Sequence, residues 1–366
     1  MMALRFVPTR LNDMSAPLLR RRHAITASVA GLALPMVAQG QPRPFTRIAF
    51  GSCADQTRPQ PVWDAVLGYR PDLFLFLGDN VYADYATSAA DTSSFHAAYD
   101  TAQKIEGYAR LRREVPHLAV WDDHDYGQND GGVGYALKDE SKSIFLDFWK
   151  APADDPRRAR EGVHDARVFG QAGQRVQVIL LDVRWSKSPW RLTDERNAPG
   201  KERYLPDDDP AKAILGEAQW AWLAEQLRVP ADLRVIGSGI QIVADGHGWE
   251  RWGNFPRERQ KLYDTIRETG ANGVVLISGD RHLGALYRET SGTPYPLLEA
   301  TSSGLNKFFP NPREAGPNRL GGVYGAPNFG TIDIDWWEGK VTLAIRDEAG
   351  QAVRRAEVRL SDLKPA

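Results

Sequence analysis

Residues 73–82 read LFLFLGDNVY, five consecutive apolar residues followed at once by a turn that carries a carboxylate and a phenol. A continuous apolar run of this length, bounded by a glycine, is typical of a strand buried on both faces. The same arrangement recurs in RIAFGSC at 47–53, LAVWDDHD at 118–125 and VVLISGDRH at 274–282. Because buried strands need cover on both faces, the sequence predicts an α/β fold.

The remaining periodicity predicts strands and helices in alternation along the chain. Amphipathic patterns indicate helices at 217–227 and 257–270, the second ending at Gly270. The carboxyl-terminal runs GTIDIDWW, KVTLAIRD and AEVRLSDL alternate apolar and polar residues, as half-exposed antiparallel strands of the same domain do. Buried strands are expected at 47–50, 73–77, 117–121, 176–181, 233–236 and 274–277.

Composition narrows the class of protein. With 366 residues, 42% of them hydrophobic and 25% charged, the chain has the composition of a globular protein and not of a disordered, collagenous or multi-span membrane protein. A single cysteine, Cys53, excludes an internal disulfide framework. The 46 basic and 47 acidic residues are scattered, so no nucleic-acid or anionic-membrane partner is implied.

Residues 1–40 differ from the rest of the chain. They hold five arginines, at positions 5, 10, 20, 21 and 22, against Asp13 alone, and the apolar stretch AITASVAGLALPMV follows at 24–37. A basic region, a short apolar stretch and the small residues Ala38 and Gly40 predict an export signal. The pair Arg21 and Arg22 favours the twin-arginine route, with a general secretory signal or a basic tail as alternatives. The mature domain is then 41–366, without a stable membrane span and periplasmic or secreted.

Reactive side chains follow four of the buried runs at the point where each ends. Taken singly, Cys53 could be a buried apolar residue, Asp79 a turn residue, and WDDHD and SGDRH hydrogen-bonded turns. Taken together they favour a shared site, because the carboxyl ends of strands in an α/β sheet meet at one crevice. The sequence therefore predicts a site for two metal ions.

The donor types divide between two cations. A thiolate, a phenolate and an imidazole, from Cys53, Tyr82 and His282, suit a Lewis-acidic transition metal such as ferric iron. Asp123 and Asp280 are hard oxygen donors of the kind that Ca²⁺, Mg²⁺ or Mn²⁺ prefers. Two such cations promote in-line displacement at phosphorus by a metal-bound hydroxide. Asp79 could bridge the two ions, and His124 could protonate the leaving alkoxide.

In combination these motifs resemble one family, the PhoD-like (alkaline phosphatase D) branch of the metallophosphatases. The resemblance covers nearly all of 41–366, through the blocks GSC, LGDNVY, WDDHD, LDVR at 181–184, WGNFPRER at 252–259, SGDRH and TSSGL at 301–305. It implies a sandwich of two mixed β-sheets flanked by helices, phosphoesterase activity, and a site pairing Fe³⁺ with Ca²⁺ or another divalent cation.

The resemblance also implies roles for individual residues. Cys53, Asp79, Tyr82 and His282 would hold iron, whereas Asp79, Asp123 and Asp280 would face calcium. His124 stands at the position of the catalytic histidine.

Two features depart from the family pattern. Longer members carry an additional amino-terminal β domain, which we expect to be missing here. A further metal ligand usually follows the strand that reads RVIGSGIQIV at 234–243, where this chain offers Ser238 and Gln241. Water or Asn129 could complete the second metal's coordination instead.

Two other features bear on the substrate. Arg184 could bind a phosphate oxygen or form a salt bridge with a carboxylate, and the sequence leaves both open. The loop DGHGWERWGNF at 245–255 places His247, Trp249 and Trp252 near the predicted site. Its aromatic residues could contact the organic part of a ligand, or Trp252 could anchor the loop in the core.

The sequence thus predicts an exported hydrolase of small-molecule or lipid phosphomonoesters, phosphodiesters or both. A phospholipase-type phosphodiesterase of the same fold is one alternative. A non-catalytic, metal-stabilised binding protein is another, as is an enzyme whose substrate is not a phosphate ester. An open position beside His124 favours catalysis, because structural metal sites are normally closed by protein ligands.

Overall fold

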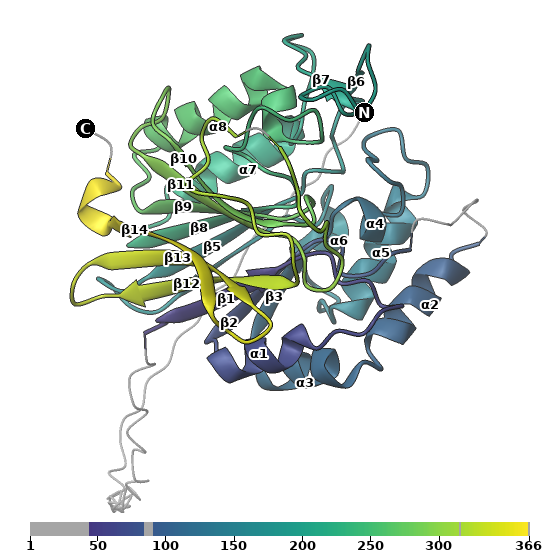
Figure 1. The fold of residues 1–366 in the computed structure, drawn as a ribbon, viewed down its shortest axis with the longest axis horizontal. Coiled ribbons are helices and arrows are strands. Elements are labelled where there is room, and N and C mark those ends of the chain that lie inside the picture. The colour runs from purple at the N-terminus through teal and green to yellow at the C-terminus, as the bar shows by residue number, and fades with distance from the viewer. Residues whose placement is uncertain (1–43, 84–90, 315, 365–366) are drawn as a thin grey trace, which may run out of the picture. The chain divides into compact units, whose positions relative to one another are not determined.

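Two mixed sheets form the centre of this structure, a computed structural model that describes residues 44–83, 91–314 and 316–364 (Figure 1). The predicted export signal at 1–40 lies outside the described residues. The first sheet contains, in spatial order, β14 (Ala352–Arg359), β13 (Lys340–Asp347), β12 (Asn328–Asp335), β1 (Arg47–Gly51), β2 (Leu73–Leu77) and β3 (His117–Val120). The second contains β10 (Gly284–Glu289), β11 (Leu297–Ser302), β9 (Val274–Ser278), β8 (Leu233–Ser238), β5 (Val176–Leu181) and β4 (Asp165–Phe169).

Both sheets combine parallel and antiparallel strands. In the first, β1, β2 and β3 are parallel neighbours, and β12, β13 and β14 pair antiparallel beside them. In the second, β5, β8, β9 and β11 are parallel, with β4 and β10 antiparallel at the two edges. A small third sheet pairs β6 (Arg191–Leu192) with β7 (Tyr204–Leu205).

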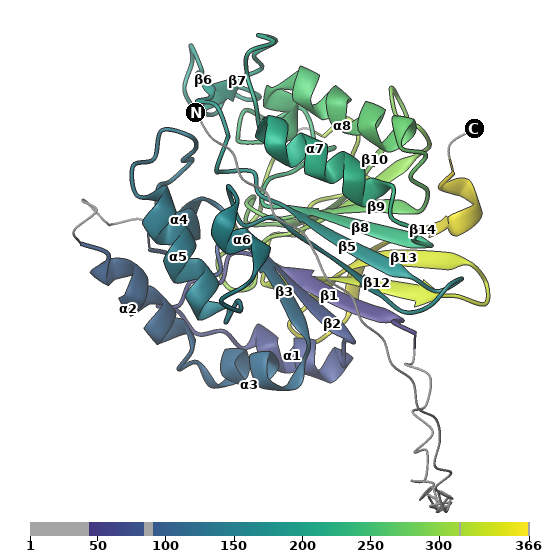
Figure 2. The same ribbon diagram turned by 180° about the vertical axis from the view of Figure 1, so that it is seen from behind.

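Helices cover the outer face of each sheet, as Figures 1 and 2 show from opposite sides. The first sheet is covered by α1 (Val62–Tyr69), α2 (Ser93–Ala102), α3 (Glu106–Glu114) and α5 (Lys138–Phe148). The second is covered by α7 (Gly216–Leu227) and α8 (Pro256–Glu268). Shorter helices are α4 (Asp123–Tyr126), α6 (Pro156–Ala159), η1 (Trp252–Asn254) and η2 (Leu360–Asp362).

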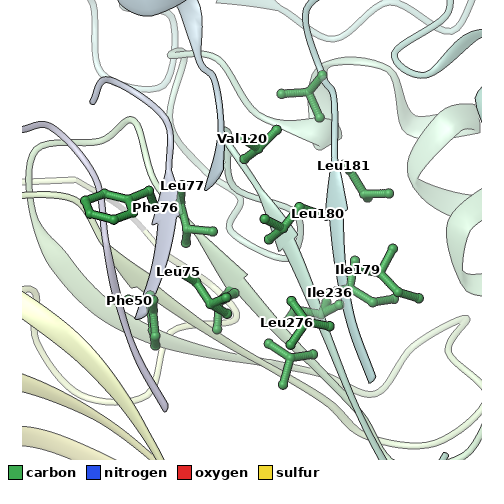
Figure 3. Close-up of a cluster of buried hydrophobic side chains, with 14 of the residues drawn as sticks. Phe50, Leu75, Phe76, Leu77, Val120, Ile179, Leu180, Leu181, Ile236 and Leu276 are labelled. Carbon is green, nitrogen blue, oxygen red and sulfur yellow. The ribbon is translucent and has the colours of Figure 1, made fainter. Parts of the chain in front are cut away.

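Alternating side chains of the buried strands pack in two directions, which explains why the strands are apolar throughout. Figure 3 shows Leu75 and Leu77 directed toward Leu180 of the second sheet, whereas Phe76 points away from it. Phe76 packs instead against Trp63 of α1 and other aromatic rings of the helical layer. Between the sheets the packing is close: a Cβ at Gly237 would lie 2.7 Å from Leu180 and 2.9 Å from Leu77.

The predicted sandwich of two mixed sheets flanked by helices is confirmed. Each of the six expected buried strands is present, and 217–227 and 257–268 are helical within α7 and α8. The antiparallel pairing of the carboxyl-terminal strands is also confirmed. The bounds predicted for the last of these strands are wrong. The alternation in AEVRLSDL predicts a strand at 356–363, whereas β14 begins at Ala352 and ends at Arg359. Arg359 pairs with Lys340, the first residue of β13, so the chain beyond it has no partner strand and turns into η2.

The carboxyl ends of β1, β2, β3 and β9 meet where the two sheets join. An isolated bridge pairs Ser52, after β1, with Ser303, after β11, and the N–H of Gly279, after β9, donates to Gly239, after β8. A Cβ at Gly279 would lie 2.6 Å from Ser52 Oγ, so this close approach requires a glycine. The Cys53 N–H donates to the carbonyl of Gly78, after β2, and the N–H of Asp79 donates to Asp125, after β3, so the four sequence clusters lie at one edge. Within the described residues, no helix is both long and apolar enough to cross a membrane.

Candidate metal centre

The backbone is strained at four of the predicted metal ligands. Cys53, Asp79, Asp280 and His282 have φ angles of 63°, 48°, 67° and 54°, in the left-handed region that non-glycine residues rarely adopt. Such a conformation costs on the order of 1–3 kcal/mol per residue and persists only where the surrounding structure holds it. Strain of this kind concentrates at functional sites, and here it falls on residues from three different loops.

The first group of donors surrounds one point. Cys53 Sγ lies 3.3 Å from Asp79 Oδ2, and the Tyr82 hydroxyl lies 3.1 Å from the same oxygen. The Tyr82 hydroxyl is also 3.3 Å from His282 Nε2. The ligand atoms of Cys53, Asp79 and His282 all lie within 4.8 Å of one another, so a single cation could contact the sulfur, the nitrogen and both kinds of oxygen.

The second group of donors adjoins the first through Asp79. Asp79 and Asp123 form one set of close ligand atoms with His124, and Asp123 forms another with Asp122 and Asp280. While Asp79 Oδ2 belongs to the first group, Asp79 Oδ1 accepts the backbone N–H of His124 at 3.3 Å. The two oxygens of one carboxylate therefore face the two groups, which is the placement expected of a bridging ligand.

Two buried carboxylate oxygens lack hydrogen-bond donors. Among the described residues, neither Asp122 Oδ2 nor Asp123 Oδ1 accepts a hydrogen bond, although both side chains are almost fully buried. Arg184 offsets part of the cost of burying these carboxylates, since its guanidinium lies 2.6 Å from Asp122 Oδ1 and 3.8 Å from Asp123 Oδ1. The two oxygens that accept no hydrogen bond could still contact a cation. The donor set, with thiol, phenol and imidazole on one side and carboxylates on the other, fits a transition metal beside a harder cation.

The protein environment by itself disfavours ionisation of most of these groups, whereas the charges of His124 and Arg184 outweigh burial and lower the pKa of Asp123. Burial, followed by the charge of Asp123, raises the pKa of Asp79 to about 7, and burial likewise raises the pKa of Asp280. Burial and the neighbouring Asp79 also raise the pKa of the Cys53 thiol and the Tyr82 phenol. A bound cation supplies the positive charge that would reverse these shifts.

Neighbouring side chains hold the donors in place. The amide of Gln56 forms two hydrogen bonds with the backbone of Tyr82, at 2.9 and 2.8 Å. Ser303 Oγ lies 3.0 Å from Cys53 Sγ and accepts the N–H of His282 at 2.8 Å. The carboxylate of Asp125 accepts the N–H groups of Asp79 and Asp122, so it joins the loops after β2 and β3.

Arg184 occupies the salt-bridge position and not a phosphate-binding one. Its guanidinium is fully buried and donates to Asp122 Oδ1 at 2.6 Å and to both oxygens of Glu250 at 2.8 and 2.9 Å. Because the guanidinium N–H groups already bind these carboxylates inside the protein, the structure favours the salt bridge over a phosphate contact. The sequence could not decide this, since Glu250 is 66 residues away along the chain.

Ser238 and Gln241, which follow the strand where the family usually has a further metal ligand, form hydrogen bonds within the core instead. Ser238 Oγ donates to the carbonyl of Ile240, and the amide nitrogen of Gln241 donates to Tyr287 and Thr301 in the core. Asn129 does line the cavity above the donors, but it is exposed.

Sequence reasoning missed other acidic candidates. Asp122 was seen as part of the WDDHD turn, yet it belongs to one donor group with Asp123 and Asp280. Asp130 and Glu250 form a further group with Asp123. The doubled aspartate in WDDHD was a signal for Asp122, whereas Glu250 had no local signal.

A cavity of about 160 Å³ opens above the donors. His124, half-buried in α4, lines it, with its ring 4.3 Å from that of Tyr82. From the aromatic loop, Trp249 reaches the cavity. Trp252 does not: it is fully buried, donates to Ser238 and packs on Trp220, so it anchors the loop.

Comparisons with known proteins agree with this arrangement. A profile of the PhoD-like phosphatase family matches residues 48–307. A solved structure of PhoD superposes with a TM-score of 0.64 at 14% sequence identity, covering 87% of this chain and 69% of that one. A structure of purple acid phosphatase PPD1 from yellow lupin (Lupinus luteus) seeds gives a TM-score of 0.57 at 10% identity, covering 87% of this chain and 55% of that one. These two similarities establish a shared fold. No curated protein matches the sequence.

The raised pKa of Asp79 predicts a pH dependence of stability in the metal-free protein. A carboxyl whose folded pKa lies above its unfolded value stabilises fully below about pH 4, and that contribution is lost as the pH rises through about 7. Asp79→Asn removes this loss, so the metal-free variant should gain stability relative to wild type from pH 5 to 7, by at most about 1.4 kcal/mol per pH unit.

Chemical denaturation of both metal-free proteins at each pH measures this difference. Comparing the two cancels the opposite dependence of buried histidines such as His282, whose pKa burial lowers to about 3. With metal ions in excess, Asp79→Asn should instead be the less stable protein. A difference between variant and wild type that does not change with pH in the metal-free state would contradict the electrostatic account.

Proposed function

Because this chain belongs to the PhoD-like phosphatase family and is therefore a metal-dependent phosphoric ester hydrolase, we propose that it hydrolyses phosphomonoesters, phosphodiesters or both in the cavity above Asp79. One observation carries the proposal. Side chains from four separate strand ends converge on adjacent donor groups, which are joined through Asp79 and Asp123, beneath an open cavity. A closed structural metal site would not need such an opening.

The donors support ferric iron in the first group and calcium, or another divalent cation, in the second. Cys53, Asp79, Tyr82 and His282 would hold the iron, and Asp79, Asp123 and Asp280 would face the second cation. When bound, the two cations would supply Lewis acidity and an activated water for displacement at phosphorus. Asp122, with its unpaired buried oxygen, is an additional candidate for the second ion.

His124 is placed to donate a proton to the leaving group. It lines the cavity, and its backbone N–H is bound to the shared carboxylate of Asp79, so its position is tied to the metal centre. Hydrolysis adds water across the P–O bond, and the departing alkoxide needs a proton. In this proposal the His124 imidazole donates it, as a general acid.

We also propose that the enzyme acts outside the cytoplasm. Support comes from residues 1–40, where arginines precede an apolar stretch and small residues. The paired Arg21 and Arg22 favour export by the twin-arginine route, which carries folded proteins.

Replacing His124 should separate chemistry from metal binding. His124→Ala is expected to retain its metals and to lower kcat on an activated aryl phosphate ester by about 10²–10⁴-fold, because the general acid is lost. Metal analysis and steady-state kinetics on the same preparation measure both quantities. His96→Ala, at an exposed position of α2, is the matched control. Unchanged turnover in His124→Ala would remove this histidine from the mechanism.

Colour tests the assignment of iron. Thiolate or phenolate bound to ferric iron absorbs visible light, so iron-loaded protein should be coloured, and Tyr82→Phe or Cys53→Ser should shift or abolish the band. Tyr69→Phe is the control, because the Tyr69 phenol binds Asp333 instead. Fully active protein that contains no iron and has no visible band would refute the iron assignment and leave a two-metal hydrolase of other composition.

Export can be tested by conservative replacement of the arginine pair. Arg21→Lys with Arg22→Lys keeps the charge, so only a pathway that reads the arginines themselves should fail, leaving the protein in the cytoplasm. Fractionation and immunoblotting measure the exported share, with Arg5→Lys and Arg10→Lys together as control. Normal export of the paired variant would argue against the twin-arginine route.

A further inference from the structure

The mouth of the cavity above the metal donors contains a tryptophan in contact with two arginines. The guanidinium carbons of Arg203 and Arg281 lie 5.1 and 5.0 Å from the centroid of the Trp249 ring. All three residues line the cavity together with Asp79 and Asp123. These contacts place positive charge beside an aromatic ring in the lining of the cavity.

The two arginines differ in how their charge is balanced. Arg281 is buried and forms an ion pair with Glu314 at 2.7 Å. Arg203 is half-buried, and its guanidinium donates to a neutral acceptor, Asn197 Oδ1, at 3.3 Å. Within the part of the chain that the structure describes, no carboxylate lies within ion-pair distance of Arg203. Arg203 therefore keeps charge and N–H groups available for a ligand.

The position of Arg203 is set by the backbone. The N–H groups of Arg203 and Tyr204 both donate to the carbonyl of Gly248, at 2.9 and 2.7 Å. The Gly248 N–H in turn binds the Glu202 carboxylate, which also accepts the N–H of Gly200. A Cβ at Gly248 would collide with the backbone nitrogen of Glu202, so the two segments meet as only a glycine allows. The Tyr204 hydroxyl adds a hydrogen bond to Asp130.

Depth in the cavity separates Arg203 from the reacting phosphoryl group. Asp79 and Asp123, at the floor, are 1% and 2% exposed. Trp249 and Arg203 are half-buried, and Phe309, whose ring centroid lies 4.8 Å from that of His282, is 45% exposed. A substrate with its phosphoryl group at the floor thus extends its ester group outward past these residues.

We propose that Arg203, whose guanidinium lies over the Trp249 ring, is a specificity residue that binds a second anionic group, a carboxylate or phosphoryl, on the ester part of the substrate. This inference rests on the proposed hydrolysis at the metal centre. Contact with the indole ring holds the guanidinium in place, and its N–H groups can form bidentate hydrogen bonds to such a group. The exposed ring of Phe309 and the half-buried ring of Trp249 suit a planar or apolar spacer between the two anions.

Matched aryl phosphates test the proposal. The series is 4-carboxyphenyl phosphate, 4-(phosphonomethyl)phenyl phosphate and the neutral 4-carbamoylphenyl phosphate, each made as monoester and as methyl diester so that either ester preference can be followed. Metal-loaded wild type should prefer the compounds with a second anion. Arg203→Gln should lower kcat/KM for those compounds by about 10- to 100-fold and for the neutral one less than about twofold. Arg196→Gln, at an exposed position of the same loop, should change none of them.

The outcomes distinguish this inference from the function on which it rests. Equal losses on all three compounds would mean that Arg203 binds the scissile phosphoryl group, and no loss would mean that it binds nothing; either overturns the proposal. Preference for only one of the two anions would identify which group the subsite accepts, and so supports it.

A binding measurement removes the dependence on turnover. Calorimetry with 4-carboxybenzylphosphonate and 4-carbamoylbenzylphosphonate, neither of which can be hydrolysed, should show the same preference and its loss in Arg203→Gln. Absence of hydrolysis with this preference intact would contradict the proposed function alone. Absence of the preference would contradict the subsite.

Discussion

The sharing of one carboxylate between two groups of donors is the constraint on which the site depends. Asp79 Oδ2 faces Cys53 and Tyr82, and Asp79 Oδ1 accepts the N–H of His124 in the group that also contains Asp123. A side chain can do this only if the loops after β1, β2, β3 and β9 arrive at one edge with their backbones nearly in contact. The left-handed φ of Asp79, the glycine at 279 and the Asp125 bridge between loops are all consequences of that requirement. The strain they hold lies at the junction of the two sheets, where a Cβ at position 279 would lie 2.6 Å from Ser52 Oγ.

Charge balance explains why the site contains a buried arginine, Arg184, that does not line the cavity. Asp122 and Glu250 lie in the interior, and the Arg184 guanidinium pairs with both. Lys187 adds positive charge 3.6 Å from Glu250. Among the described residues, neither Asp79 nor Asp280 forms such an ion pair, and burial raises the pKa of both even though the charges of His124 and Arg281 oppose it. The protein therefore neutralises one part of the acidic cluster with its own cations and leaves the other part to metal ions.

How much could be predicted from the sequence depends on how far apart along the chain the interacting residues lie. Strand and helix positions depend on local periodicity, and the ligand clusters directly follow strands, so both were visible in runs such as LFLFLGDNVY. The end of β14 was misplaced because it depends on where β13 begins, a pairing that local alternation does not reveal. Arg184 was ambiguous for the same reason: its partners Asp122 and Glu250 are 62 and 66 residues away. Asp130 and Glu250 join the acidic cluster through tertiary packing, and no pattern in their neighbourhoods marks them.

The turns that hold the metal donors and the loop that lines the mouth of the cavity differ in how closely they are tied to the core. The donors stand on turns between buried strands, where the core restricts every change. Arg203 and Tyr204 belong to a loop segment with the two-residue strands β6 and β7, attached to the rest through Gly248 and Asp130. Tyr204 packs in the core, whereas most of the segment, Arg203 included, is half-buried or exposed, and the backbone contacts at Gly248 fix where its side chains stand. A fold built in this way can keep one set of reactive groups while the side chains at positions such as 203 determine which ester reaches them.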